Sequence, residues 1–124
     1  VEKWRTTAIE AAKQCGNPWL PEISSVQNLS SWLITAQDFD LKLIASLHAG
    51  ATPLPVVLHR YQSRQGTRPR RVLWLIGPEG DFSPSEMTQA ITHGFLPITL
   101  GPLVLRSETA AIYALSILSH ELQK

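Results

Sequence analysis

The stretch from residue 72 to residue 86 constrains the fold of this chain more than any other. Val72–Ile76 is a continuous apolar and β-prone run, which is typical of a central parallel strand covered on both faces. Gly77–Asp81 follows, and its two glycines and one proline predict a tight loop. A helix should begin next, because Ser83 is a preferred N-cap residue, Pro84 suits the first helical position and Glu86 completes a capping box.

The same order of elements recurs on both sides of this stretch. Leu41–Leu47 is a short apolar run that predicts a buried strand, and Pro97–Leu100 predicts another. The second of these runs into a further Gly-Pro loop, Gly101–Arg106. A last helix is expected from Ser107 to about Leu122, and its first half is apolar nearly all round, which predicts burial on several sides. This alternation predicts an α/β domain with a mostly parallel sheet.

Two more helices are expected. Apolar residues recur at helical spacing from Glu2 to Cys15, and Gly16 is placed for a left-handed cap. The segment Pro53–Gln65 fits a strand or a helix, and we favour the helix because its first prolines suit a helix start.

Composition excludes several classes of protein. A length of 124 residues fits one domain, and 44% hydrophobic residues exclude a disordered chain. No apolar run approaches the ~20 residues that span a bilayer, so no membrane protein is expected. The lone cysteine, Cys15, fits a reduced, cytoplasmic compartment and is expected to be inert packing. The first residues form no signal peptide and include no initiator methionine, so we expect an internal piece of a longer protein.

Positive charge is concentrated in one segment, although the net charge is only +1. The cluster consists of Arg60, Arg64, Arg68, Arg70 and Arg71 with His59 beside them. Such a cluster suits phosphate binding, or it is a solvated helix end and loop. Both interpretations stay open at this point.

Several familiar sites are absent from the sequence. It contains no phosphate-binding P-loop motif, no Gly-x-Gly-x-x-Gly dinucleotide fingerprint and no Gly-x-Ser-x-Gly nucleophile elbow. The four histidines and one cysteine lack metal-ligand spacing, so no metal is expected.

Two Gly-Pro loops remain as the candidate site, because ligands of open α/β sheets bind beyond the carboxyl ends of strands. Glu79 and Asp81 stand at alternate positions of the first loop, which does not make them converge as an acid–base pair. Arg106 and Glu108 stand where the second loop meets the last helix. They are candidates for chemistry, or they form an ion pair that holds the loop.

Two motifs, in this order and spacing, resemble one known family. The first is LIGPEGDFSPSE from Leu75 to Glu86, and the second is LGPLVLRSETA from Leu100 to Ala110. Residues in the range from Trp4 to Ile23 also match. The chain is similar, over nearly its whole length, to the small-subunit (16S) ribosomal RNA uridine-N3 methyltransferases of the knotted SPOUT class.

This resemblance implies a parallel-sheet α/β fold with a C-terminal trefoil knot, in which the last helix is threaded through a loop. It also implies a cytoplasmic homodimer that uses S-adenosylmethionine to methylate N3 of a uridine during ribosome biogenesis. The cofactor would be held largely by backbone groups of three loops. The residues carried over for cofactor binding are Leu47, His48, Ile76, Gly77, Pro78, Glu79, Gly80, Leu100, Gly101, Leu105 and Arg106.

The methylation of uridine N3 that the resemblance implies assigns a role to an arginine. Uracil N3 must lose a weakly acidic proton, and a positive charge near the carbonyl oxygens stabilises the anion that forms. We assign that role to Arg106, with RNA phosphate binding as its alternative. Glu79 and Glu108 are both candidates for the base, and Glu108 also suits a role in orienting Arg106.

The chain departs from the family pattern at several points. Asp81 stands where the family usually has a glycine, and Leu103 where it usually has an arginine. The family's N-terminal RNA-binding β-barrel, and the first strand and helix of the methyltransferase domain, would precede Trp4. We therefore expect residues 1–124 to be a partial SPOUT domain. A non-catalytic knotted domain that binds RNA or dimerises is the alternative function.

Overall fold

The computed structural model describes residues 2–16, 21–45, 51–77, 82–99 and 107–122. The chain divides into two compact units, Val1–Trp32 and Leu33–Lys124. The first unit contains helix α1 (Glu2–Gln14), which confirms the expected helix. After α1, Gly16 takes a left-handed φ of 71°, as the cap prediction requires. Cys15 is exposed, so the expectation that this thiol is buried packing is wrong.

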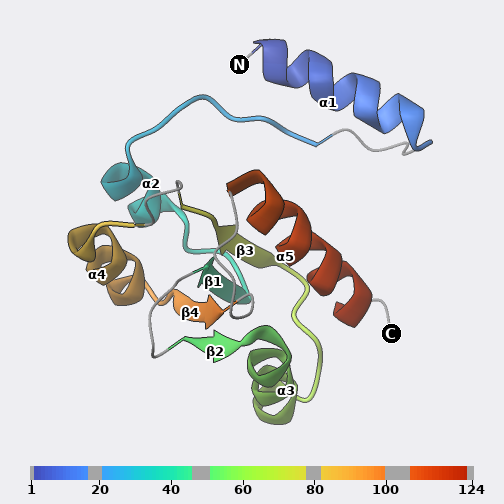
Figure 1. Cartoon of the computed structure of the whole chain (residues 1–124). Helices are drawn as coiled ribbons and strands as arrows, with labels where there is room; N and C mark the ends of the chain where they lie inside the picture. The colour runs from blue at the N-terminus through green and yellow to red at the C-terminus, as the bar shows by residue number, and fades with distance from the viewer. Residues whose placement is uncertain (1, 17–20, 46–50, 78–81, 100–106, 123–124) are drawn as a thin grey trace. The chain divides into compact units, whose positions relative to one another are not determined.

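The second unit is built on a parallel sheet (Figure 1). The strands are β1 (Leu41–Ala45), β2 (Thr52–Pro53), β3 (Val72–Leu75) and β4 (Leu96–Thr99). Their order is β2-β4-β1-β3, and every printed pairing is parallel. Helix α2 (Leu29–Thr35) precedes the sheet, and α3 (Leu54–Gln65), α4 (Pro84–Thr92) and α5 (Ser107–Leu122) follow individual strands. The predicted α/β fold is therefore confirmed.

The central place in this sheet belongs to β1 rather than β3. Among the described strands, β3 pairs only with β1 and all four of its residues are half-buried. By contrast, Leu43 and Ile44 of β1 are fully buried. Within the described sheet β3 therefore stands at the border, since an apolar run reports burial of the two faces but does not report which neighbours pair with it.

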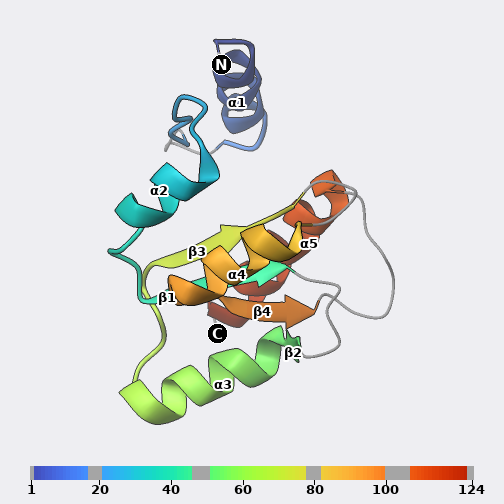
Figure 2. The same cartoon turned by 90° about the vertical axis from the view of Figure 1, so that its left-hand side faces the viewer.

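Helices cover both faces of the sheet (Figures 1 and 2). On one face, α3 and α5 share a core with the sheet in which Leu43, Leu58 and Leu118 are buried together. On the other face lies α4, and there the Lys42 ammonium donates a hydrogen bond to the His93 carbonyl. Strand residues alternate between these faces because successive side chains of a strand point in opposite directions.

The last helix is less buried than its sequence predicts. In α5, Ala110, Ala114 and Leu118 are buried at a spacing of four residues. Ile112 and Leu115 are 67% and 63% exposed, respectively. The expected burial on several sides is therefore not found in the described chain. One side of α5, with the two alanines and Leu118, is buried, whereas Ile112 and Leu115 lie on the exposed side.

Local sequence signals set the ends of α3 and α4 as expected. The segment Pro53–Gln65 is helical from Leu54 onward, and Gly66 ends α3 with a left-handed φ of 74°. At the start of α4, the Glu86 backbone N–H donates to Ser83 Oγ at 3.1 Å. The Ser83 N–H donates in return to Glu86 Oε1 at 2.8 Å, which confirms the predicted capping box.

Candidate functional site

Three neighbouring strands end at the same edge of the sheet. Ile44 of β1 lies beside Leu75 of β3, and Ala45 of β1 lies beside Ile98 of β4. Because the strands are parallel, their carboxyl ends meet at this edge, which we call the carboxyl edge. The chain leaves β1, β3 and β4 here toward the three segments that carry the predicted cofactor-binding residues. This is the place where open α/β sheets bind ligands.

Only part of the predicted site lies within the described residues. Ile76 and Gly77 follow β3 directly and are half-buried. Glu108 lies in the first turn of α5 and is exposed. The predicted site residues outside the described part of the chain are Leu47, His48, Pro78, Glu79, Gly80, Leu100, Gly101, Leu105 and Arg106.

Gly77 lies directly against an aromatic ring. A Cβ atom built on Gly77 would be 2.8 Å from Cε2 of Phe82, closer than real Cβ contacts allow. The absence of a side chain at Gly77 therefore brings the backbone after β3 against the residue that precedes α4. The capping box fixes the backbone at Ser83, and so it limits where the preceding residue, Phe82, can lie.

Phe82 was not among the predicted site residues. In the sequence, Phe82 stands between a Gly-Pro loop and a capping box. A large apolar side chain at such a position is expected to pack against its neighbours, and this could have pointed to Phe82. The Gly-Pro loop and the capping box each have a short local signature, and Phe82 belongs to neither.

Glu108 has a local role that needs no partner in the second loop. A carboxylate in the first turn of a helix is stabilised by the positive end of the helix dipole. This role is compatible with the predicted roles of Glu108 as a base or as a group that orients Arg106. Those two roles stay predictions because Arg106 lies outside the described residues.

The opposite, amino edge of the sheet is held by charged groups. The backbone N–H groups of Arg70 and Arg71 donate to Asp40 Oδ2 at 2.7 and 3.1 Å. These two hydrogen bonds hold the pKa of the Asp40 carboxyl below its ordinary value of 3.8. The Arg71 guanidinium also donates to Asp38 Oδ2 at 2.6 Å and lies 4.6 Å from the centroid of the Phe39 ring.

These contacts separate the arginines of the cluster into two groups. Arg71 belongs to the amino edge, and Arg68 Nη1 donates to the Leu122 carbonyl at 3.2 Å. Both side chains therefore have structural contacts. Arg60, Arg64 and Arg70 are exposed, and for them the two interpretations of the cluster stay open.

The described residues show two further features that bear on function. They contain no group of three or more His, Cys, Asp or Glu residues placed to hold a metal ion. None of the helices in the described ranges is long and apolar enough to cross a membrane.

Comparison with known proteins gives one consistent family. A model of the RNA methyltransferase domain matches residues 1–119. Ribosomal RNA small subunit methyltransferase E of Buchnera aphidicola (subspecies Acyrthosiphon pisum) is 33% identical over 119 residues, which are 95% of this chain and 43% of that protein. The enzyme of the same name from Bacillus subtilis is 29% identical over 122 residues, which are 97% of this chain and 46% of that protein.

Solved structures agree with this comparison. A Legionella pneumophila protein described as a methyltransferase, in complex with S-adenosylmethionine, is 38% identical with a TM-score of 0.82, over 97% of this chain and 46% of that one. Ribosomal RNA small subunit methyltransferase E of Neisseria gonorrhoeae, bound to S-adenosylmethionine, is 27% identical with a TM-score of 0.82, over 96% of this chain and 46% of that one. The chain thus spans less than half the length of each of these four proteins.

Proposed function

Because this chain belongs to the RNA methyltransferase domain family, of the type found in ribosomal RNA small subunit methyltransferase E, we propose that it serves S-adenosylmethionine-dependent methylation of ribosomal RNA. The target is N3 of a uridine in the 16S RNA of the small subunit, and the reaction takes place in the cytoplasm. The observation that carries the proposal is the meeting of three strand ends at the carboxyl edge, from which every predicted cofactor-binding segment starts.

The described residues at this edge fit the cofactor. Ile76 and Gly77 are half-buried and follow β3 directly, so they stand at the edge where open α/β sheets bind ligands. S-adenosylmethionine, when bound, supplies an electrophilic methyl group. The role that we assign to Ile76 and Gly77 is to hold the cofactor by backbone contacts, with the Phe82 ring packed against Gly77.

The remaining chemistry is assigned to three charged residues. We assign to Arg106 the stabilisation of the negative charge that develops on the uracil carbonyl oxygens. Glu79 or Glu108 accepts the N3 proton, which makes this nitrogen the nucleophile. The support for Glu108 is its position in the first turn of α5, directly after the second loop.

Threading of α5 through a knot, and pairing of two copies, are further parts of the proposal. The face of α5 that carries Ile112 and Leu115 supports the homodimer, because apolar side chains with this exposure suit a protein interface. We expect Leu115→Glu to convert a dimer to a monomer in analytical ultracentrifugation. Ser63→Glu, at an exposed position of α3 and away from this face, is the control and keeps the dimer. A wild-type chain that is monomeric at all concentrations contradicts the homodimer.

A calorimetric titration with S-adenosylmethionine tests the proposed function directly. Saturable binding at one site is the expected result, followed by methylation of small-subunit RNA by the longer parent protein. Arg106→Ala should keep cofactor binding and lower methyl transfer by about 10²–10³-fold, as the loss of a charge-stabilising group does. Lys13→Ala, on an exposed side chain of α1 outside the arginine cluster, serves as the control and changes neither quantity. Near-normal turnover of Arg106→Ala removes this residue from the chemistry.

A second candidate function rests on one specific observation. Leu103 stands where the family usually has an arginine, so one charge expected near RNA or cofactor is missing. This departure favours a non-catalytic knotted domain that binds RNA or dimerises. The same titration separates the two candidates, because a catalytic domain has to bind the cofactor. Failure to bind, in this chain and in the longer parent, supports the second candidate.

A further inference from the structure

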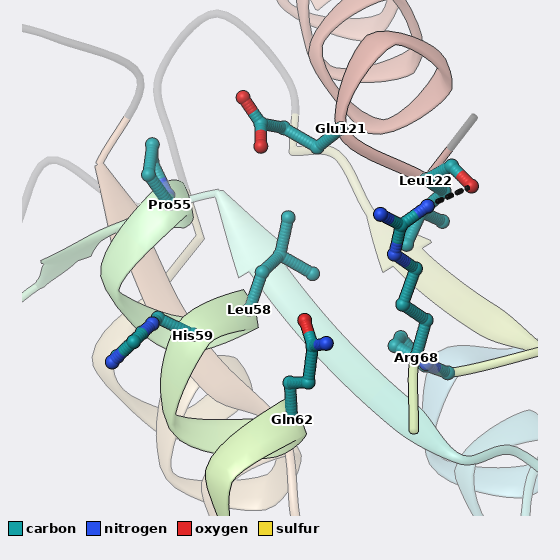
Figure 3. A pocket seen from close by; sticks show the side chains of 8 residues that line it. Pro55, Leu58, His59, Gln62, Arg68, Glu121 and Leu122 are labelled. Carbon is teal, nitrogen blue, oxygen red and sulfur yellow. Dashed lines mark hydrogen bonds between the residues drawn. The ribbon is translucent and has the colours of Figure 1, made fainter. Parts of the chain in front are cut away.

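A cavity lies away from the carboxyl edge, between α3 and the end of α5 (Figure 3). Its volume is about 240 Å³. Leu58, His59 and Gln62 line it from α3, Arg68 lines it from the segment after α3, and Glu121 and Leu122 line it from α5. None of the residues predicted for the cofactor or the chemistry belongs to it. The proposed function therefore leaves this cavity unexplained.

The cavity is held open by the fold itself. Arg68 Nη1 donates to the Leu122 carbonyl at 3.2 Å, which ties the segment after α3 to the last turn of α5. The Gly66 N–H donates to the Gln62 carbonyl at 2.8 Å, which fixes the last turn of α3. The walls are thus positioned before any ligand arrives, as in most small-molecule sites.

The polar groups stand around an apolar floor. Figure 3 shows Leu58 in the middle of the cavity, with Glu121 on one side and Gln62 on the other. Leu58 is 9% exposed, so its side chain offers a nearly fixed apolar surface. A flat ring fits such a floor, with its edge turned toward the polar groups. The cavity is also smaller than the ~300–1,000 Å³ of drug-sized ligand sites, which suits one ring system.

The charges of the lining favour a ring over a bare anion. One guanidinium, that of Arg68, is accompanied by one carboxylate, that of Glu121. Within the described part of the chain, the Gln62 carboxamide and the His59 imidazole make no side-chain hydrogen bond. A carboxamide offers one donor and one acceptor side by side, which match N7 and the N6 amino group of adenine.

We propose that this cavity binds an unpaired adenine base of the RNA, which lies over Leu58 and is recognised by Gln62. Unpaired bases are the parts of RNA that proteins recognise by stacking and by edge hydrogen bonds. The inference rests on the proposed function, since it assigns to the RNA substrate a contact outside the methylated uridine.

A nuclear magnetic resonance titration of the chain with adenosine tests the proposal. Adenosine should shift the resonances of the Gln62 side-chain amide and of His59, with uridine giving smaller shifts and inorganic phosphate none. An absence of adenosine shifts in this cavity overturns the proposal. Equal shifts from phosphate also overturn it, since the cavity is then an anion site.

A variant pair locates the recognition in one side chain. Gln62→Leu should reduce the preference for oligoadenylate over oligouridylate by about 5- to 100-fold, the range expected for loss of one bidentate contact to a base. Gln65→Leu, on the same helix but outside the cavity, should keep the preference. Circular dichroism checks that both variants are folded. An unchanged preference in Gln62→Leu overturns the proposal.

These measurements need neither S-adenosylmethionine nor methyl transfer, so the two proposals fail separately. Adenosine is itself a part of S-adenosylmethionine, so the readout is the shift of Gln62 and His59 and not adenosine binding as such. Cofactor binding without these shifts overturns only the adenine site. These shifts without cofactor binding, in this chain and in the longer parent, overturn the methyltransferase proposal and leave an RNA-binding domain.

Discussion

The two edges of the parallel sheet are built from different kinds of residue. At the amino edge, charged side chains close the structure: Asp40 accepts two backbone hydrogen bonds, and Arg71 pairs with Asp38 while it lies over Phe39. At the carboxyl edge, the described strand ends carry small or apolar residues such as Ala45 and Gly77. Charged side chains thus take part in the contacts of the amino edge, whereas Gly77 at the carboxyl edge has no side chain.

This difference teaches how one sheet serves both stability and ligand binding. Contacts between loops at the amino edge hold the starts of β1 and β3 together. The carboxyl edge is thereby free to place glycine-containing segments where backbone groups approach a ligand. Changes at the carboxyl edge should therefore affect ligand binding more than stability, and changes at the amino edge should do the reverse.

The largest effect is expected at the carboxyl edge. Gly77→Ala places a Cβ against the Phe82 ring, so the ring or the backbone has to move. We expect affinity for S-adenosylmethionine to fall at least about tenfold, or ~1.4 kcal/mol, in calorimetry. The double variant Gly77→Ala with Phe82→Leu should recover part of this loss. Unchanged affinity in Gly77→Ala contradicts a site that depends on this close approach.

The next largest effect is expected for a change at Lys42, in the middle of the sheet. The Lys42 ammonium donates to the His93 carbonyl at the end of α4 and lies 5.5 Å from the centroid of the Phe95 ring. Lys42→Met removes the charge and keeps the length, so we expect a loss of about 1 kcal/mol in the free energy of unfolding. Chemical denaturation measures it. Lys13→Met, on an exposed side chain of α1, is the control.

A smaller effect with a distinct pH dependence is expected for Asp40→Asn. The folded-state pKa of Asp40 lies below 3.8, so its carboxylate stabilises the fold above that pH. This contribution is lost as the pH falls through the lowered pKa. The difference in Tm between wild type and Asp40→Asn should be constant near neutral pH and shrink in acid. A difference that grows in acid has the wrong sign for this mechanism.

The smallest effect is expected for Asp38→Ala. The Asp38 carboxylate is 99% exposed, so its ion pair with Arg71 lies in water and is screened by salt. We expect a loss of at most about 0.5 kcal/mol in the free energy of unfolding, with no change in cofactor affinity. Denaturation at low and high salt checks this. A loss above 1 kcal/mol makes this ion pair a main contact of the amino edge.

Local signals predicted much of the fold, because they act over a few residues. Ser83 and Glu86 set the start of α4, and Gly16 and Gly66 take the left-handed conformation that ends a helix. The predicted site segments follow strands whose carboxyl ends meet at one edge, and strand ends followed by Gly-Pro loops are visible in the sequence. Phe82 was missed because its contact with Gly77 depends on how the chain returns toward the strand.

The sequence by itself determined the elements, their order and the residue types at the carboxyl edge, since these depend on periodicity, capping and backbone freedom. The tertiary structure alone decided that, among the described strands, β1 lies inside the sheet and β3 at its border, and which side of α5 is buried. The adenine cavity also arises only in three dimensions, because Gln62 and Glu121 are far apart along the chain. Which strands pair, and which side chains meet in a cavity, depends on how much apolar surface each possible arrangement buries. This buried surface is a property of the whole chain.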